Sequence, residues 1–201
     1  MPSIYGLKSS FQNLLRPLTR LLARMGVTAN QVTLFALALS FATGGLIWAF
    51  PDEAWPLFLV APVLFARMAL NAIDGMLARE HHMKSKLGAI LNELGDVLSD
   101  AALYLPYATR PGVSPHLLVL AVLLSVISEM AGVVAIQIGS DRRYDGPMGK
   151  SDRAFVFGVL ALLLGFKAPT EAWLLYALAA VNIFLLLTIF NRARMALRKA
   201  G

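Results

Sequence analysis

Six apolar stretches of about 20 residues each make up most of this 201-residue chain. A helix needs about 20 mostly apolar residues to cross roughly 30 Å of hydrocarbon, so each stretch is long enough to span a membrane. The composition agrees, since 58% of the residues are hydrophobic and 15% are charged, against about half and about a quarter in soluble domains. The pattern predicts an all-α integral membrane protein with six transmembrane helices, near residues 31–50, 54–78, 88–108, 116–139, 152–169 and 172–190.

The first 26 residues predict a helix that lies in the membrane interface and precedes the spans. Leucines and Phe11 recur there at steps of three and four residues, and the segment lacks the uninterrupted apolar core of a signal peptide. An apolar stripe beside a basic face is typical of interfacial helices. The basic residues are Lys8, Arg16, Arg20 and Arg24. We expect a single domain over residues 1–201, made of an interfacial helix at 1–26, a six-helix bundle at 27–191 and a cytoplasmic tail at 192–201.

Basic residues gather on one side of the predicted bundle. Of the 18 lysines and arginines, four lie in residues 1–26, three follow the second stretch, four precede the fifth and four lie in the tail. The opposite loops contain only Arg110 and Lys167, and Arg67 lies inside a stretch. Under the positive-inside rule, both termini face the cytoplasm, as an even number of spans requires. The net charge of +6 is therefore assigned to cytoplasmic loops, and no nucleic-acid partner is expected.

Ionisable and amide side chains are concentrated in the second and third stretches. An ionisable group within the hydrocarbon region costs at least about a few kcal/mol and is usually retained for function. The chain has no cysteine, which excludes thiolate metal sites and cysteine nucleophiles. The polar residues are Arg67, Asn71 and Asp74 in the second stretch, and Asn92, Glu93, Asp96 and Asp100 in the third.

Helix geometry brings these two groups to a similar depth. At about 1.5 Å per residue, Asn71 lies about 12 Å from Arg79 along the second stretch, and Asp96 lies about 12 Å from Gly88 along the third. Spacings of three or four residues place the polar side chains of each helix on one stripe. Two facing stripes of oxygen atoms, beside the basic loop that joins the helices, suit a hard divalent cation with a phosphate-bearing ligand. The sequence therefore predicts a magnesium–phosphate site that opens toward the cytoplasm.

Residues 71–96, NAIDGMLAREHHMKSKLGAILNELGD, resemble the signature of the CDP-alcohol phosphotransferases, D-x2-D-G-x2-A-R-x8-G-x3-D-x3-D. An earlier segment, TANQVT at residues 28–33, is similar to the family's usual entry into its first span. The resemblance implies a multi-pass protein of a bacterial inner membrane, commonly a homodimer. It also implies metal-dependent transfer of a substituted phosphate from a CDP-linked donor to an alcohol, with release of CMP. The positions that match the signature are Asp74, Gly75, Ala78, Arg79, Gly88 and Asp96.

The resemblance further implies a role for each residue of the site. Asp96 is the expected general base, which accepts the proton of the attacking hydroxyl, with helix packing as the structural alternative. Arg79 is expected to contact the donor pyrophosphate, with snorkelling to the membrane surface as its alternative. The expected ligands of Mg²⁺ or Mn²⁺ are Asn71, Asp74, Asn92, Asp96 and Asp100. The expected donor-binding residues are Asn30, Thr33, Asp74, Gly75, Ala78, Arg79 and Gly88.

Asn71 and Asn92 depart from the family's pattern, which has aspartate at both positions. An amide oxygen can ligate magnesium, but the loss of two negative charges makes a two-metal arrangement harder to neutralise. We expect one metal ion or weaker metal binding. The alternative is that Glu93, Asp100 or Glu129 restores negative charge from another direction; Glu129, in the fourth stretch, is equally compatible with a hydrogen bond between helices.

A basic segment before the fifth stretch, DRRYDGPMGKSDRAF, is the second candidate feature. Its cations either satisfy only the orientation rule or bind the acceptor, as the resemblance implies. In the second case, a phosphorylated alcohol such as glycerol 3-phosphate or inositol phosphate fits four cations better than a neutral alcohol does. Ser151 is also expected to be the N-cap of the fifth stretch. The expected acceptor-binding residues are Arg142, Arg143, Lys150, Ser151 and Arg153.

Three classes of function are compatible with these patterns. The first is a phospholipid-synthesis transferase that uses CDP-diacylglycerol, whose acyl chains can stay in the bilayer beside a site only about 12 Å deep. The second is a catalytically weak or inactive protein that binds a CDP-lipid or nucleotide, as the two asparagines suggest. The third is an ion transporter, which is disfavoured because the polar residues do not continue through the outer halves of the spans.

Overall fold

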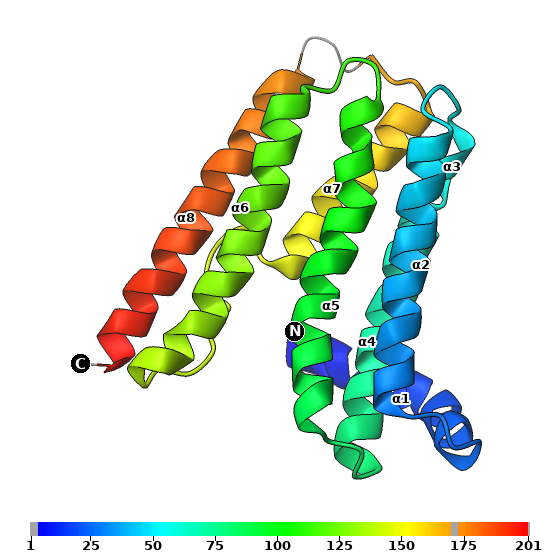
Figure 1. Ribbon diagram of the computed structural model, residues 1–201, viewed down its shortest axis with the longest axis vertical. Coiled ribbons are helices and arrows are strands. Elements are labelled where there is room, and N and C mark those ends of the chain that lie inside the picture. Colours follow the sequence, from blue (N-terminus) through cyan, green and yellow to red (C-terminus); the bar gives the residue numbers. More distant parts are fainter. Residues whose placement is uncertain (1–3, 170–172, 201) are drawn as a thin grey trace. The chain divides into compact units, whose positions relative to one another are not determined.

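The computed structural model describes residues 4–169 and 173–200, and that part of the chain is helical without a strand (Figure 1). This confirms the predicted all-α class. The elements are α1 (Ile4–Arg24), α2 (Ala29–Ala49), α3 (Trp55–Phe58), α4 (Val60–Glu80), α5 (Lys86–Tyr104), the 3-10 helix η1 (Leu105–Thr109), α6 (Pro115–Val134), the 3-10 helix η2 (Ala135–Ile138), α7 (Lys150–Gly165) and α8 (Leu174–Ala200).

Four helical segments of the described residues are long and apolar enough to cross a membrane: Ala29–Ala49, Trp55–Glu80, Pro115–Ile138 and Leu174–Ala200. The structure therefore supports a helical membrane protein but not the predicted count of six spans. The third stretch, α5, carries Lys86, Glu93, Asp96 and Asp100 within its 19 residues. The fifth, α7, has only 16 residues and begins with charged side chains, so it is shorter than the roughly 20 residues that a span needs.

Most predicted helix ends agree with the observed ones to within a few residues. The second stretch is divided at Leu59 into α3 and α4, and Pro62 lies in the first turn of α4, where a missing N–H is tolerated. The predicted start of the sixth stretch, residue 172, lies outside the described residues. The helix that follows, α8, continues to Ala200, so the predicted tail is a helical continuation of the sixth stretch up to that residue.

The chain forms two compact units, each of which is discontinuous in sequence. The first comprises Met1–Ala42 and Pro62–Ser99, and the second comprises Thr43–Ala61 and Asp100–Gly201. The prediction of one domain over residues 1–201 stays a prediction.

In the first unit, the amphipathic helix α1 packs its apolar side against α2 and α4. The buried cluster contains Val32 from α2 and Met76 and Leu77 from α4, and Leu15 and Leu22 of α1 lie against it. On the other side, Arg16 forms a two-pronged ion pair with Glu80 at the end of α4, with N–O distances of 3.2 and 3.0 Å. This amphipathic helix, predicted to lie in the membrane interface, is therefore also held against α2 and α4.

A capping box begins α2 and fixes its first turn. Thr28 Oγ1 accepts a hydrogen bond from the Gln31 N–H at 3.3 Å, and Gln31 Oε1 accepts one from the Thr28 N–H at 2.9 Å. These reciprocal bonds satisfy backbone donors that a helix start leaves unpaired. The TANQVT segment thus has a local physical role, which is to set the position of Asn30 and Thr33 at the start of α2.

In the second unit, α6 and α8 pack along each other (Figure 1). Asn182 of α8 donates to the carbonyl oxygen of Leu117 of α6 at 3.0 Å. The rings of Tyr104 and Phe157 stack at 4.1 Å between centroids, and the Tyr107 hydroxyl donates to the Phe157 carbonyl oxygen at 3.2 Å. These contacts join the end of α5 and η1 to α7.

Candidate metal and phosphate site

A pocket of about 430 Å³ lies in the first unit, between the starts of α2 and α5 and the second half of α4. It includes every residue that was predicted to bind the donor and three of the predicted metal ligands. The lining residues are Ala29, Asn30, Thr33, Asn71, Asp74, Gly75, Ala78, Arg79, Met83, Lys84, Ser85, Gly88, Ala89 and Asn92. Segments that are far apart in sequence therefore form one small cavity, lined by one acid together with amides and cations.

Among the residues that the structure describes, Asp74 is the one aspartate that lines this pocket. Its side chain is only 6% exposed, and its Oδ2 accepts a hydrogen bond from Thr33 Oγ1 at 2.8 Å. The same hydroxyl lies 3.2 Å from the carbonyl oxygen of Ala29 in the preceding turn. Thr33, predicted as a donor-binding residue, therefore also orients a predicted metal ligand.

Asn71 and Asp96 meet across α4 and α5, as their equal predicted depths required. Asn71 Nδ2 donates to Asp96 Oδ1 at 3.3 Å. An ionised carboxylate has no hydrogen to donate, so the nitrogen of the amide is the atom that faces it. Asn92 is exposed on α5 and lines the pocket. Asn71 and Asp96 therefore meet as predicted, whereas Asp100, the deepest member of the predicted stripe on α5, is paired with Arg153.

Two glycines of the signature allow close approaches around the pocket. A Cβ on Gly75 would lie 3.2 Å from both Nη atoms of Arg79, so the guanidinium lies over this glycine. A Cβ on Gly88 would lie 2.7 Å from Asn30 Oδ1. Gly75 thus makes room for Arg79, and Gly88 lets the first turn of α5 approach α2.

The start of α5 also faces the pocket. Ser85 precedes the helix, and its Oγ accepts a hydrogen bond from the Gly88 N–H at 2.9 Å, as an N-cap does. Ser85, Gly88 and Ala89 line the cavity together with Arg79 and Lys84. The N-terminal end of a helix carries partial positive charge, so this wall of the pocket favours an anion.

The donor atoms of the pocket suit a hard cation. Among the described residues, no three His, Cys, Asp or Glu side chains lie close enough together to hold a metal ion. The oxygens of Asp74, Asn71 and Asn92 in the pocket, and those of Asp96, which Asn71 contacts, are nevertheless of the kind that Mg²⁺ and Mn²⁺ prefer. The set fits a divalent ion that completes its coordination with water or phosphate oxygens.

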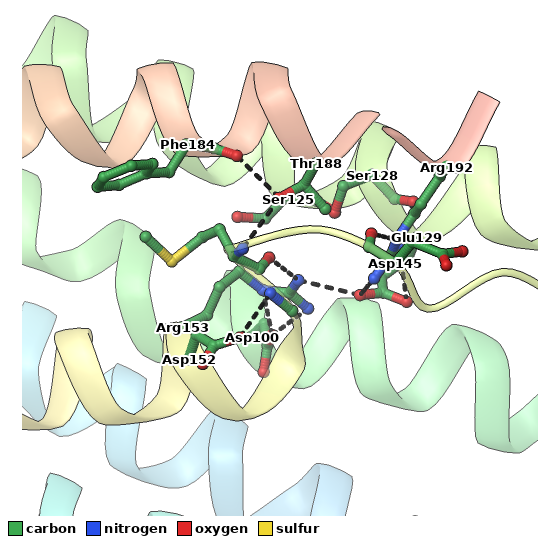
Figure 2. A network of polar contacts seen from close by, with 12 residues as sticks. Asp100, Ser125, Ser128, Glu129, Asp145, Asp152, Arg153, Phe184, Thr188 and Arg192 are labelled. Atoms are coloured by element: carbon green, nitrogen blue, oxygen red, sulfur yellow. Dashed lines mark hydrogen bonds and ion pairs between the residues drawn. The ribbon is translucent and has the colours of Figure 1, made fainter. Parts of the chain in front are cut away.

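Asp100 belongs to a second polar cluster, in the second unit (Figure 2). Arg153 of α7 donates through Nε and Nη2 to Asp100 Oδ2, at 3.2 and 3.1 Å. Its Nη1 donates to Glu129 Oε1 of α6 at 2.9 Å. Arg153 is only 2% exposed, so this is a buried ion-pair network. The charge of Asp100, a predicted metal ligand, is therefore already neutralised by Arg153.

Glu129 accepts from arginines of three segments, which Figure 2 shows in part. Besides Arg153, Arg192 Nη2 lies 3.4 Å from Glu129 Oε1, and Arg142 Nη2 lies 3.3 Å from Oε2. Arg192 is 1% exposed and also donates to the carbonyl oxygens of Ser128 and Asp145. Glu129 therefore joins helices. Sequence reasoning missed Arg192, which counted only as one of the cations of the tail.

The predicted acceptor residues lie in or beside this network. The two guanidinium nitrogens of Arg143 that face Asp145 bind its carboxylate at 2.7 and 2.8 Å and hold the pKa of Asp145 below its ordinary value. Lys150 is the first residue of α7. The prediction that Ser151 caps this helix is wrong: the N-cap is Gly149, whose N–H donates to Asp152 Oδ2 at 2.9 Å.

We expect Glu129→Gln to lower the free energy of unfolding by about 3–5 kcal/mol, because removing one member of a buried ion pair leaves guanidinium groups buried without their partner. The midpoint of thermal unfolding in detergent measures this. The control is Asp141→Asn, which removes an exposed ion pair with Lys199. The side chain of Asp141 is 76% exposed and that of Lys199 is 51% exposed, so this variant should change the midpoint little. Equal midpoints for the two variants would contradict a buried structural network.

Residues 26–191 match the protein family described as CDP-alcohol phosphatidyltransferase. Inner membrane protein YnbA of Escherichia coli strain K12 is 46% identical over 198 residues, which cover 97% of this chain and 96% of that protein. A phosphatidylinositol phosphate synthase of Corynebacterium glutamicum is 30% identical over 213 residues, which cover 98% of this chain and 89% of that protein. The similarity therefore extends far beyond the signature.

Two crystal structures of the phosphatidylinositol phosphate synthase of Mycobacterium tuberculosis share the fold. The complex with manganese and citrate has a TM-score of 0.76 at 21% identity and covers 92% of this chain and 90% of that chain. The structure with CDP-DAG bound has a TM-score of 0.69 at 22% identity and covers 92% of each chain. The name of the YnbA relative and the four apolar helices both fit a bacterial inner membrane.

Proposed function

Because the chain belongs to the CDP-alcohol phosphatidyltransferase family, we propose that it transfers the phosphatidyl group of CDP-diacylglycerol to the hydroxyl of an alcohol and releases CMP. The observation that carries the proposal is the pocket of about 430 Å³, where five of the six matched residues of the signature, all but Asp96, meet Asn30 and Thr33. The pocket brings an acid, amides and cations together, which are the groups that transfer of a phosphate-bearing group requires.

The cationic wall of the pocket is assigned to the donor pyrophosphate. Arg79 presents a planar guanidinium over Gly75, and Lys84 adds a second positive charge. The start of α5 provides backbone N–H groups and the positive end of the helix dipole. Together these groups favour the two negative charges of a diphosphate at the mouth of the site.

The acidic and amide residues are assigned to a divalent ion, Mg²⁺ or Mn²⁺. Asp74, Asp96, Asn71 and Asn92 would hold it, and Thr33 fixes the orientation of Asp74. When bound, such an ion stabilises negative charge on the transferred phosphoryl group and on the departing CMP.

Asp96 is assigned the role of general base. Its carboxylate accepts the proton while the acceptor oxygen forms a bond to the β-phosphorus and the bond from that phosphorus to CMP breaks. The Asn71 N–H, at 3.3 Å, orients one oxygen of Asp96. The acceptor is an alcohol. Two of the arginines predicted to bind a phosphate on it, Arg153 and Arg143, are paired with Asp100, Glu129 and Asp145. A phosphorylated and a neutral acceptor are therefore both tested directly.

The proposed membrane arrangement rests on the apolar stretches and on the positions of the basic residues. We propose six spans, with α5 and α7 as polar and short members of the bundle, both termini in the cytoplasm and the pocket open to the cytoplasm. The basic residues Arg16, Arg20 and Arg24 of α1 support a position of this helix at the inner surface. The proposed assembly is a homodimer in a bacterial inner membrane.

The direct test is release of CMP by the purified protein from CDP-diacylglycerol, with Mg²⁺ or Mn²⁺ and a panel of alcohols. The panel includes glycerol 3-phosphate, inositol phosphate and their unphosphorylated forms. We expect CMP release that requires the ion and that occurs with one class of these acceptors. Asn71 and Asn92 motivate a second candidate, a protein that binds a CDP-lipid without turnover. Binding of CDP-diacylglycerol with no CMP release above background for any acceptor would favour that candidate.

A further inference from the structure

Each of the two carboxylates of the site has a neutral hydrogen-bond donor. Thr33 Oγ1 donates to Asp74 at 2.8 Å, and Asn71 Nδ2 donates to Asp96 at 3.3 Å. With its nitrogen toward Asp96, Asn71 has only Oδ1 to offer a cation. Two aspartates at this separation would repel each other unless a cation or a proton lay between them. The N–H of the Asn71 amide therefore faces Asp96 with partial positive charge. An aspartate in place of Asn71 would need a bound cation between the two carboxylates.

The charges around the pocket limit the number of divalent ions that it can bind. Arg79 and Lys84 line the cavity and offset the charges of Asp74 and Asp96. The pyrophosphate of a CDP-linked donor brings two negative charges, which one divalent ion offsets. A second divalent ion would leave two positive charges uncompensated in a cavity partly walled by buried side chains, where the effective dielectric constant is low.

We propose that the site of each protomer holds a single divalent ion, and that Asn71 and Asn92 set this number. The inference rests on the proposed function, because the charge balance includes the pyrophosphate of the donor. Asn92 offers an amide oxygen without a charge, and Asn71 is a positioning residue that takes the place of a second ion beside Asp96. Aspartate at both positions would add two negative charges, which is the charge that one more divalent ion neutralises.

Titration with Mn²⁺ followed by electron paramagnetic resonance tests this count, because two manganese ions about 3.5–4 Å apart are magnetically coupled and an isolated ion is not. We expect the wild-type protein to bind one Mn²⁺ per protomer with an uncoupled spectrum, with and without CDP-diacylglycerol. The double variant Asn71→Asp/Asn92→Asp should bind two ions with a coupled spectrum. The control Asn13→Asp, which adds a charge on the exposed part of α1, should keep one ion.

The wild-type count is decisive even where the double variant fails to fold. Two coupled ions in an active wild-type protein would overturn the inference and leave the proposed function intact. A folded double variant that still binds one ion would overturn the role of the two asparagines. Absence of Mn²⁺ binding by the wild type, together with absence of CMP release, would overturn the proposed function and this inference at once.

Discussion

Asp96→Asn is expected to reduce CMP release at least about a hundredfold, since general bases typically contribute that much or more. The substituted amide has nearly the same shape but cannot take a proton from the attacking hydroxyl. Asp96 is half-buried on α5 and meets the Asn71 amide at 3.3 Å. Because asparagine at this position can also accept a hydrogen bond, through its carbonyl oxygen, the helices should stay in contact and the protein should fold.

The rate is measured as CMP release at saturating ion and acceptor, with unfolding midpoints to show that the variant is folded. Asp52→Asn is the matched control, because Asp52 is an exposed aspartate of the second unit. It should keep the wild-type rate. If Asp96→Asn retained more than about a tenth of the wild-type rate, the assignment of the base would be wrong.

Asp74→Asn is expected to remove most of the affinity for the divalent ion together with turnover. Asp74 is the one acidic residue that lines the pocket, and it is 6% exposed. Stabilisation by the ion contributes several kcal/mol at a reacting phosphoryl group, so its loss should slow CMP release at least about a hundredfold. Thr33 can still donate to the amide oxygen at this position, which preserves the local contact.

Two readouts separate the causes of this loss. Mn²⁺ titration should show weakened binding by Asp74→Asn, and higher Mn²⁺ concentrations should recover part of the rate. Asp96→Asn should instead lose its rate at every ion concentration. Wild-type Mn²⁺ affinity in Asp74→Asn would show that this residue is not a ligand.

The polar stripes of α4 and α5 could be predicted from sequence because helical periodicity fixes both their faces and their depths. Asn71 and Asp96 meet as that arithmetic requires. Asn30 and Thr33 entered the prediction through the resemblance of TANQVT to the family, and the structure adds the physical reason, a capping box that sets the start of α2.

The arginine network could not be predicted in the same way. Arg153 pairs with residues 53 and 24 positions away, and Arg192 pairs with Glu129 across 63 positions. Periodicity gives the face of one helix but not the partner on another, so Asp100 was placed on the metal stripe by its spacing from Asp96. The count of six spans was not supported for a different reason: the charged residues of α5 lower the hydropathy of this helix.

The most direct measurement of the central claim is anomalous diffraction from crystals grown with Mn²⁺ and CDP-diacylglycerol. We predict one manganese peak per protomer in contact with carboxylate oxygens of Asp74 and Asp96, with the donor pyrophosphate between that ion and Arg79. A manganese peak away from Asp74, or a nucleotide bound outside the pocket between α2, α4 and α5, would contradict the account.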